Sequence, residues 1–163
     1  MSTPETLRIA LADLENPLQA EAVVKIIDAY AMEPHGGGQS LPDEVRQRIV
    51  PGLRATPGAF VLLAWDGEQP IGAAICFRGF STFSGKPLAN VHDLSVLQPY
   101  RGRGIGTRLL QAVEDHVRGF GGSKVTLEVR LANPEAERLY QRLGFGDPSG
   151  FATRFLDKPL GTL

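Results

Sequence analysis

The sequence predicts a mixed α/β (α+β) fold built on a mostly antiparallel sheet. Apolar runs of strand length gather in the middle of the chain, where the pair Asp66-Gly67 marks a hairpin turn. The second half then reads as strand, helix, strand, helix. With 163 residues, 42% of them hydrophobic and 21% charged, the chain has the size and composition of one globular domain. We therefore expect a single domain over residues 1–163.

The N-terminal part is expected to hold a short strand and two helices. Leu7–Leu11 resembles a strand, and Gln19–Met32 carries apolar residues at helical spacing. Residues 33–40 contain three consecutive glycines, which predict a mobile loop because glycine disfavours regular structure. Pro42 suits the first turn of a second helix over Asp43–Leu53.

The middle of the chain reads as three strands. Ala59–Trp65 and Pro70–Phe77 flank the hairpin turn, and a polar connection over residues 81–87 leads to a strand over Leu88–Leu97. Cys76 is the one cysteine of the chain and lies in an apolar run, so we expect a buried thiol that acts as a small hydrophobic side chain.

Two helices and two strands are expected after residue 100. The first helix runs from Gly104 to Phe120, and a strand follows over residues 124–130. Asn133 and Pro134 are typical of a helix N-terminus, and Gly144 would end that second helix. Residues 151–155 are expected to form the last strand.

Charge and motifs exclude several classes of function. The net charge is −1, with basic and acidic residues spread along the chain, so neither nucleic acid nor a membrane is expected as a partner. No targeting pattern and no apolar run of membrane-spanning length is present, which predicts a cytoplasmic protein. The histidines His35, His92 and His116 are far apart and lack metal-site companions, so no metal is expected.

The turn Arg101-Gly-Arg-Gly-Ile-Gly106 carries the clearest chemical signal. It joins a strand to an amphipathic helix, whose first N–H groups and dipole favour an anion. The glycines let a phosphate approach the backbone, and two arginines add positive charge. A Walker A loop is excluded because no Gly-Lys-Ser/Thr follows at the required spacing, and a Rossmann loop because the third glycine stands at the wrong place.

These residues resemble the GNAT (GCN5-related) N-acetyltransferase family. Asp93-Leu-Ser-Val96 followed by the glycine turn is similar to its acetyl-CoA motif, and residues 133–145 are similar to its second signature, N-x-x-A-x-x-x-Y-x-x-x-G-F. The resemblance covers about residues 59–155. The stretch Ser81–Lys86 is similar to the diamine and polyamine acetyltransferase branch of the family.

The resemblance implies acetyl-CoA as cosubstrate and a sheet that splays between the strand at 88–97 and the strand at 124–130. The pyrophosphate would sit on backbone amides of the glycine turn, and the pantetheine arm would pair with the strand before it. Asn133 would touch that arm, cap its own helix, or do both. The implied coenzyme-binding residues are Leu94, Ser95, Val96, Arg101, Gly102, Arg103, Gly104, Ile105, Gly106, Thr107, Asn133 and Tyr140.

The implied reaction is direct attack of an amine on the thioester in a ternary complex. Tyr140 would donate a proton to the leaving thiolate, or it only packs within its helix. The base is left open between His92, which stands where polyamine-type relatives carry an acid, and Asp93. In a regular strand these two side chains face opposite sides unless a bulge intervenes. Further candidates for the acceptor site are Glu128, on the next strand, and Glu33 and His35, in the glycine loop with which the family covers the acceptor site.

The favoured prediction is an N-acetyltransferase that acts on a primary amine of a small molecule. The alternatives are a protein or peptide N-acetyltransferase and an acyl-CoA-binding sensor without turnover. A proton donor at Tyr140 favours an enzyme over a sensor. A homodimer is expected because the family commonly forms one.

Overall fold

The computed structural model describes residues 6–130, 132–147, 150 and 156–161. They belong to two compact units, Met1–Arg130 and Leu131–Leu163, and each is described by itself. The expected last strand, over residues 151–155, lies outside the described residues. None of the helices that the structure describes is long and apolar enough to cross a membrane.

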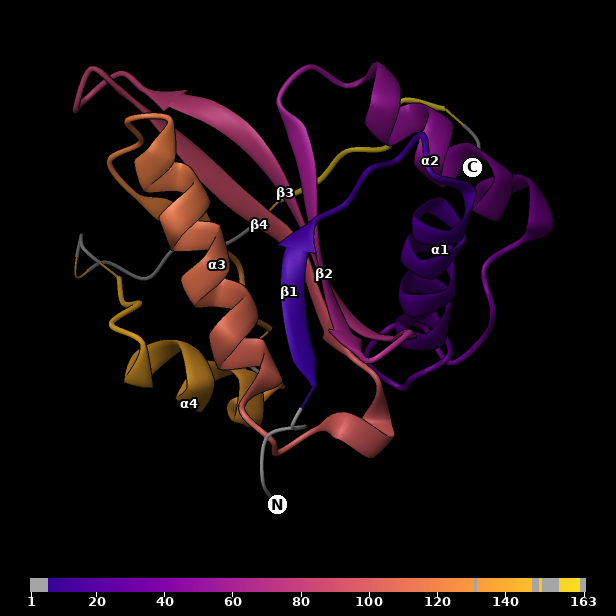
Figure 1. Cartoon of the computed structure of the whole chain (residues 1–163). Helices are drawn as coiled ribbons and strands as arrows, with labels where there is room; N and C mark the ends of the chain where they lie inside the picture. The colour runs from indigo at the N-terminus through magenta and orange to yellow at the C-terminus, as the bar shows by residue number, and fades with distance from the viewer. Residues whose placement is uncertain (1–5, 131, 148–149, 151–155, 162–163) are drawn as a thin grey trace. The chain divides into compact units, whose positions relative to one another are not determined.

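The first unit is built on a five-stranded sheet whose strands follow one another in chain order (Figure 1). The strands are β1 (Leu7–Leu11), β2 (Ala59–Asp66), β3 (Gln69–Ser81), β4 (Lys86–Val96) and β5 (Val125–Leu127). The first four pair antiparallel, and β5 adds parallel to β4. The predicted mixed, mostly antiparallel sheet is confirmed.

Three helices cover the two faces of this sheet. Helices α1 (Pro17–Ala31) and α2 (Asp43–Ala55) lie on one face, and α3 (Ile105–Gly119) lies on the other (Figure 1). All three were predicted. Helix α1 begins two residues earlier than expected because the Asn16 side chain caps it, accepting hydrogen bonds from the N–H groups of Leu18 and Gln19.

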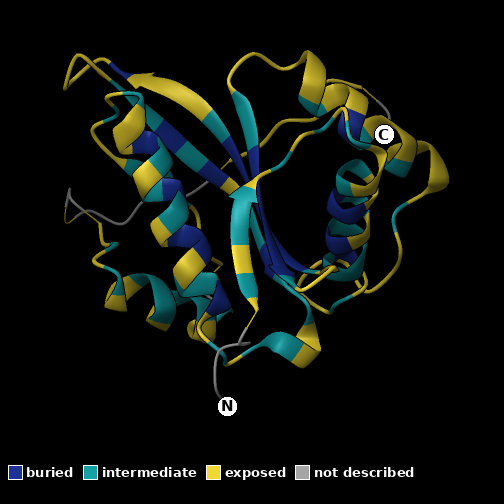
Figure 2. Cartoon of the chain, viewed as in Figure 1, coloured by how far each residue is buried: buried dark blue, intermediate teal, exposed yellow. Residues whose placement is uncertain are grey.

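The apolar core fills the space on both sides of β2 and β3. Figure 2 shows the buried residues along these strands and on the inner sides of α1 and α3. The cluster under α1 contains Ala22, Val23, Ile26, Val61, Leu63, Trp65, Ala73 and Ile75. The buried residues of α3 are Ile105, Leu109, Leu110, Val113 and Val117. Packing on both faces therefore holds the sheet rigidly and fixes the position of the C-terminal end of β4.

The strands differ from the expectation in their lengths. Residues 81–87 are not a separate connection, because β3 and β4 continue to a tight hairpin in which Ser81 pairs with Lys86. Strand β5 is shorter than the expected strand at 124–130 and ends at Leu127. The hairpin lengthens β4 at its N-terminal end, away from the glycine turn.

The second unit contains helix α4 (Pro134–Arg142). Asn133 caps it as predicted, with its side-chain oxygen accepting a hydrogen bond from the Ala136 N–H at 3.1 Å. Gly144 follows the end of the helix with a φ of 86°, a left-handed conformation that favours glycine. The expected apolar stripe is half-buried and consists of Ala136, Leu139, Tyr140 and Leu143.

Candidate functional site

The turn between β4 and α3 presents backbone donors to an open space. Gly102 and Gly104 have φ values of 72° and 77°, and a Cβ placed on Gly102 would meet no atom within 4 Å. Gly104 is the N-cap of α3, and no side chain among the described residues caps the helix. The first bond into the helix runs from the Arg108 N–H to the Gly104 carbonyl at 3.1 Å. The amides of residues 105–107 come before this bond, so the helix start fits an anion.

Arg101 does not add its charge to this turn in the way that the sequence suggested. Its backbone N–H donates to the Gln98 carbonyl at 3.2 Å, and its Nε donates to the Val96 carbonyl at 2.9 Å. Its Nη2 forms an ion pair with the carboxylate of Glu33, 68 residues earlier in the chain. The charge of Arg101 is therefore largely matched inside the protein.

Arg103, the second arginine of the turn, lies against an aromatic ring. Its guanidinium carbon is 5.4 Å from the ring centre of Tyr100, within the range of a cation–π contact. Tyr100 belongs to a short 3₁₀ helix, Gln98–Tyr100, that links β4 to the turn.

Strand β4 has one open edge beyond Val91. Its parallel pairing with β5 covers only Ala89, Asn90 and Val91, and no other described strand pairs with that edge. On its other edge, Leu94, Ser95 and Val96 pair with β3. The splay that the resemblance implied is thus confirmed within the described residues. It leaves the backbone groups of one edge available beside the glycine turn.

Gly72, which the sequence analysis missed, determines how closely the end of β4 packs. It pairs with Val96, and a Cβ added to it would lie 3.0 Å from the Ser95 carbonyl oxygen. The same Cβ would lie 3.3 Å from Leu109 of α3. A glycine within an apolar strand is a signal of close backbone approach, so the sequence held a clue to this position.

A β-bulge places His92 and Asp93 on the same face of the sheet. Val91 pairs with Cys76 and Asp93 pairs with Ile75, which leaves His92 as the extra residue. The His92 ring packs against Phe77, with ring centres 5.5 Å apart. Both Phe77 and Ile75 belong to the cluster under α1, so His92 and Asp93 both face the side of α1 and α2.

The two side chains differ in their surroundings. His92 is exposed, whereas Asp93 is half-buried. Burial raises the pKa of Asp93 above its ordinary value of 3.8, and the neighbouring His92 opposes part of that shift. An exposed imidazole beside a carboxyl group with a raised pKa is an arrangement that can accept and hold a proton.

Cys76 is fully buried, as predicted. Burial, with a further contribution from the charge of Asp93, raises the pKa of its thiol to about 12. The thiol therefore stays protonated at neutral pH and acts as part of the core.

The segment after α1 forms a compact turn. The N–H groups of Gly36, Gly37 and Gly38 all donate to the Glu33 carbonyl, and that of Gly38 also donates to the Ala31 carbonyl. A Cβ on Gly36 would lie 2.0 Å from the Tyr30 carbonyl oxygen, so only glycine fits there. The glycines close the turn onto the end of α1, where the sequence predicted a mobile loop.

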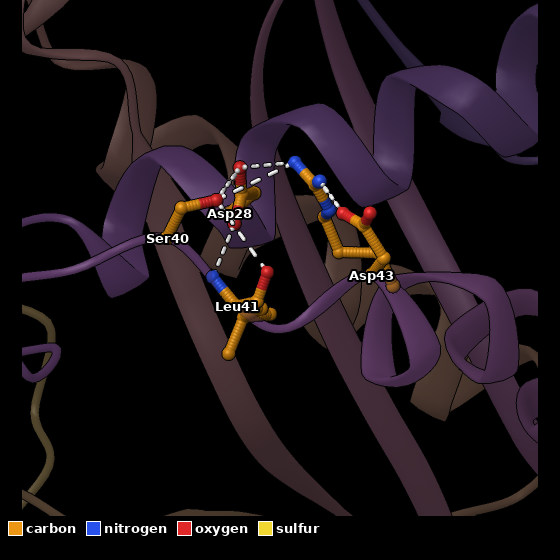
Figure 3. A network of polar contacts seen from close by, with 5 residues as sticks. Asp28, Ser40, Leu41 and Asp43 are labelled. Atoms are coloured by element: carbon orange, nitrogen blue, oxygen red, sulfur yellow. Dashed lines mark hydrogen bonds and ion pairs between the residues drawn. The ribbon is translucent and has the colours of Figure 1, made fainter.

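The far end of this segment is held by Asp28 of α1. Figure 3 shows the Asp28 carboxylate beside Ser40 and Leu41. It accepts hydrogen bonds from Ser40 Oγ at 2.9 Å and the Leu41 N–H at 2.7 Å, and its Oδ2 lies 3.3 Å from Arg46 Nη1. Burial opposes ionisation, but these donors outweigh it and hold the pKa of Asp28 below 3.8.

The other candidates lie just after the ends of α1 and β5. Strands β4 and β5 are parallel, so both run toward the same end of the sheet, but β5 pairs only with Ala89, Asn90 and Val91 of β4. Glu128 lies just past the end of β5 and is exposed, although the sequence placed it within the strand. Arg130, which the sequence analysis missed, donates from Nη1 to the His35 carbonyl at 3.0 Å. Two arginines thus bind the segment after α1, Arg101 through the Glu33 carboxylate and Arg130 through the His35 carbonyl.

The remaining candidates, Asn133 and Tyr140, lie in the second unit. The Asn133 side-chain oxygen is the cap of α4. The Tyr140 ring lies 6.0 Å from that of Phe145, and its carbonyl accepts hydrogen bonds from the N–H groups of Leu143 and Phe145. Their proposed roles toward a coenzyme stay predictions.

Known proteins with similar sequences are acetyltransferases. Over 87 residues the chain is 36% identical to N-alpha-acetyltransferase 30 of Schizosaccharomyces pombe. The aligned region covers 53% of this chain and 57% of the relative. It is 35% identical over 85 residues to mycothiol acetyltransferase of Corynebacterium glutamicum, covering 52% of this chain and 27% of that protein. The chain thus spans less than two thirds of the length of either relative.

The fold is also shared with solved structures. A crystal structure described as a probable acetyltransferase matches with a TM-score of 0.79 at 21% identity, covering 93% of this chain and 98% of that one. A family model described as "Acetyltransferase (GNAT) family" matches residues 23–145, which include both the glycine turn and the second signature. The chain belongs to the GNAT acetyltransferase family.

Proposed function

We propose that this protein transfers the acetyl group of acetyl-CoA to a primary amine by direct attack in a ternary complex. The observation that carries the proposal is the join between β4 and α3. There an open strand edge ends beside an uncapped helix N-terminus, with two glycines in left-handed conformations between them. A strand edge can pair with an amide-containing arm, and a helix start can bind a pyrophosphate. Family membership supports the same proposal.

Each group of residues has its own role in the proposed reaction. The amides of residues 102–107 bind the pyrophosphate, and residues 94–96 pair with the pantetheine arm. Acetyl-CoA supplies the activated thioester. Either His92 or Asp93 takes the proton from the acceptor ammonium, and the bulge supports this because it turns both toward the same face. Tyr140 donates a proton to the sulfur, and Asn133 contacts the coenzyme arm. These roles require residues 1–163 to work as one domain, which is part of the proposal.

The favoured acceptor is a primary amine of a small molecule. The exposed carboxylate of Glu128 would attract a cationic amine, and Glu33, whose carboxylate is paired with Arg101, and His35 would contact the acceptor from the segment after α1. Ser81–Lys86, the stretch similar to the diamine and polyamine branch, forms the hairpin at the other end of β3 and β4 from Val96. A polyamine therefore has support from sequence likeness alone and none from the geometry of the open edge of β4.

A second candidate acceptor is the N-terminal amine of a protein or peptide. The observation that favours it is the 36% identity to N-alpha-acetyltransferase 30. A sensor that binds acetyl-CoA without turnover is the remaining alternative. We also propose that the protein lies in the cytoplasm and forms a homodimer. Light scattering of the purified protein measures the number of chains in the assembly.

The deciding experiment measures acetyl-CoA binding by calorimetry and thiol release against a panel of amines. The panel holds diamines, amino acids, aminoglycosides and short peptides with free N-termini. Turnover with small amines supports the favoured acceptor, and turnover with peptides alone supports the second candidate. Binding without turnover on any amine favours the sensor. Absence of acetyl-CoA binding would contradict all three.

A further inference from the structure

Arg101 occupies the first position of the glycine turn, yet its contacts lead back into the protein. Its backbone N–H, its Nε and its Nη2 are all engaged, with the Gln98 carbonyl, the Val96 carbonyl and the Glu33 carboxylate. The side chain is about 39% exposed, and that of Glu33 about 26%. A guanidinium already paired with a carboxylate gains little from a second anion, because the first has matched its charge.

The contacts of Arg101 join two parts of the site. Val96 is the last residue of β4, beside the open edge. Glu33 begins the compact turn after α1, and its carbonyl accepts the N–H groups of Gly36, Gly37 and Gly38. One side chain thus connects the end of the sheet to the start of residues 33–41, which we call the strap.

The strap has two further attachments. Arg130, just past β5, donates to the His35 carbonyl at 3.0 Å. Asp28 binds Ser40 and the Leu41 N–H at the other end of the strap. Two arginines, one in the turn between β4 and α3 and one just past β5, therefore hold the first half of the strap, and α1 holds the second half.

We propose that Arg101 is a positioning residue, which fixes the strap over the ends of β4 and β5 rather than binding the coenzyme. This inference rests on the proposed function, in which the strap contributes Glu33 and His35 to the acceptor site. Occupation of the β4 edge and the order of the strap are then coupled through Arg101. The coupling is reciprocal: coenzyme binding orders the strap, and an ordered strap favours coenzyme binding.

The test is amide hydrogen exchange of Gly36, Gly37 and Gly38, measured with and without saturating acetyl-CoA. We expect Arg101→Met to speed their exchange about tenfold, because the opening of the turn becomes easier. Glu33→Gln should have a similar effect, and the double variant should add little, since both changes break one contact. Arg101→Lys keeps the charge but loses the second donor of the fork, so it should restore only part of the protection. Arg108→Met, an exposed arginine on α3, is the matched control.

Acetyl-CoA separates positioning from coenzyme binding. In the unmodified protein it should slow exchange of the three glycines, and in Arg101→Met this effect should be lost. Calorimetry should show acetyl-CoA affinity for Arg101→Met within about threefold of the parent, a small energetic difference. A loss of affinity of about tenfold or more with unchanged glycine exchange would overturn the inference and make Arg101 a coenzyme ligand.

The inference and the proposed function can fail separately. If the unmodified protein binds no acetyl-CoA, the proposed function fails, while the exchange of Gly36–Gly38 in Arg101→Met still decides whether Arg101 holds the strap. If acetyl-CoA binds and Arg101→Met leaves the exchange of these glycines unchanged, the proposed function stands and the positioning role is wrong.

Discussion

At the scale of single residues, Asp93 links burial to the pH dependence of stability. Its pKa is raised in the folded protein, chiefly by burial, so the native state binds this proton more tightly than the unfolded chain does. The stabilisation that results is fully present below the unfolded value of 3.8 and is lost as the pH rises through the folded pKa.

Asp93→Asn removes this loss because asparagine stays neutral. The melting temperature of the variant minus that of the parent should therefore become more positive between about pH 4 and about pH 7. Scanning calorimetry at both pH values measures it. Asp157→Asn, at an exposed position, is the control and should follow the parent at each pH. If the melting temperature of the variant minus that of the parent became smaller toward neutral pH, the fold would stabilise Asp93 as a carboxylate.

Tyr140 carries the clearest catalytic prediction at this scale. If its hydroxyl donates the proton to the leaving thiolate, Tyr140→Phe should fold normally and lower kcat by about 10- to 1000-fold, the range for a general acid. Turnover with the amine found in the panel measures kcat, and circular dichroism checks the fold. Tyr30→Phe on α1 is a matched control that removes the same group. A Tyr140→Phe enzyme with the parent's kcat would exclude the hydroxyl from the mechanism.

The residue scale also shows where sequence reasoning reaches its limit. The buried Cys76 and the cap at Asn133 could be predicted because both follow from local pattern. The partners of Arg101 could not, because the ion pair with Glu33 joins positions 68 residues apart. In the sequence Arg101 is a cation in an anion-binding turn, and only the fold reveals that its charge is already paired.

At the scale of elements, the start of α3 is where a charge change should have the largest effect on the coenzyme. Gly102→Glu places a carboxylate in the space open to the pyrophosphate, and like charges brought together in this way cost several kcal/mol. We expect acetyl-CoA affinity, measured by calorimetry, to fall by at least about tenfold.

Gly85→Glu provides the matched control for this change. Gly85 also has a positive φ, 62°, and a Cβ there also meets nothing within 4 Å, but it lies in the hairpin between β3 and β4. Both variants carry the same conformational strain and the same added charge. Equal losses of affinity in the two would mean that the effect is general and that the pyrophosphate does not bind at the α3 turn.

A second pair of glycines tests how tightly β4 is packed. Gly72→Ala puts a methyl group 3.0 Å from the Ser95 carbonyl oxygen and should destabilise the protein by about 1–3 kcal/mol, as overpacking does. Gly52→Ala, in the exposed interior of α2 with no atom within 4 Å, should stabilise it by about 0.5–1 kcal/mol. Urea denaturation gives both values. A neutral Gly72→Ala would show that the sheet can relax at this point.

Among the elements, those with strong local signals were predictable and those shaped by their partners were not. Helix α3 begins within a residue of the expected position, because Gly104 and Gly121 bracket a clear apolar stripe. The bulge at His92 has no sequence signal, since it arises from the register of β4 against β3. Strand β5 is shorter than the expected strand at 124–130 because its parallel partner diverges after Val91. The divergence that shortens β5 also opens the edge on which the proposed function depends.

At the scale of the whole molecule, the proposed chemistry requires both compact units to act together. The glycine turn and the open edge of β4 belong to Met1–Arg130, while Asn133 and Tyr140 belong to Leu131–Leu163. The family match over residues 23–145 extends across the boundary between the units. A single functional domain should therefore unfold as one cooperative body, as small domains usually do.

Two optical probes can test this cooperativity. Trp65, the one tryptophan of the chain, lies in β2 and reports on the first unit, whereas far-ultraviolet circular dichroism reports on the helices of both. We expect their thermal transitions to coincide. Acetyl-CoA at about 100 times its Kd should add about 2.7 kcal/mol of stability and shift both transitions upward together by about 5–10 °C. The Gly102→Glu variant should show no such shift. Two separate transitions, or a coenzyme shift confined to the Trp65 signal, would mean that the units fold independently, and the single domain would be wrong.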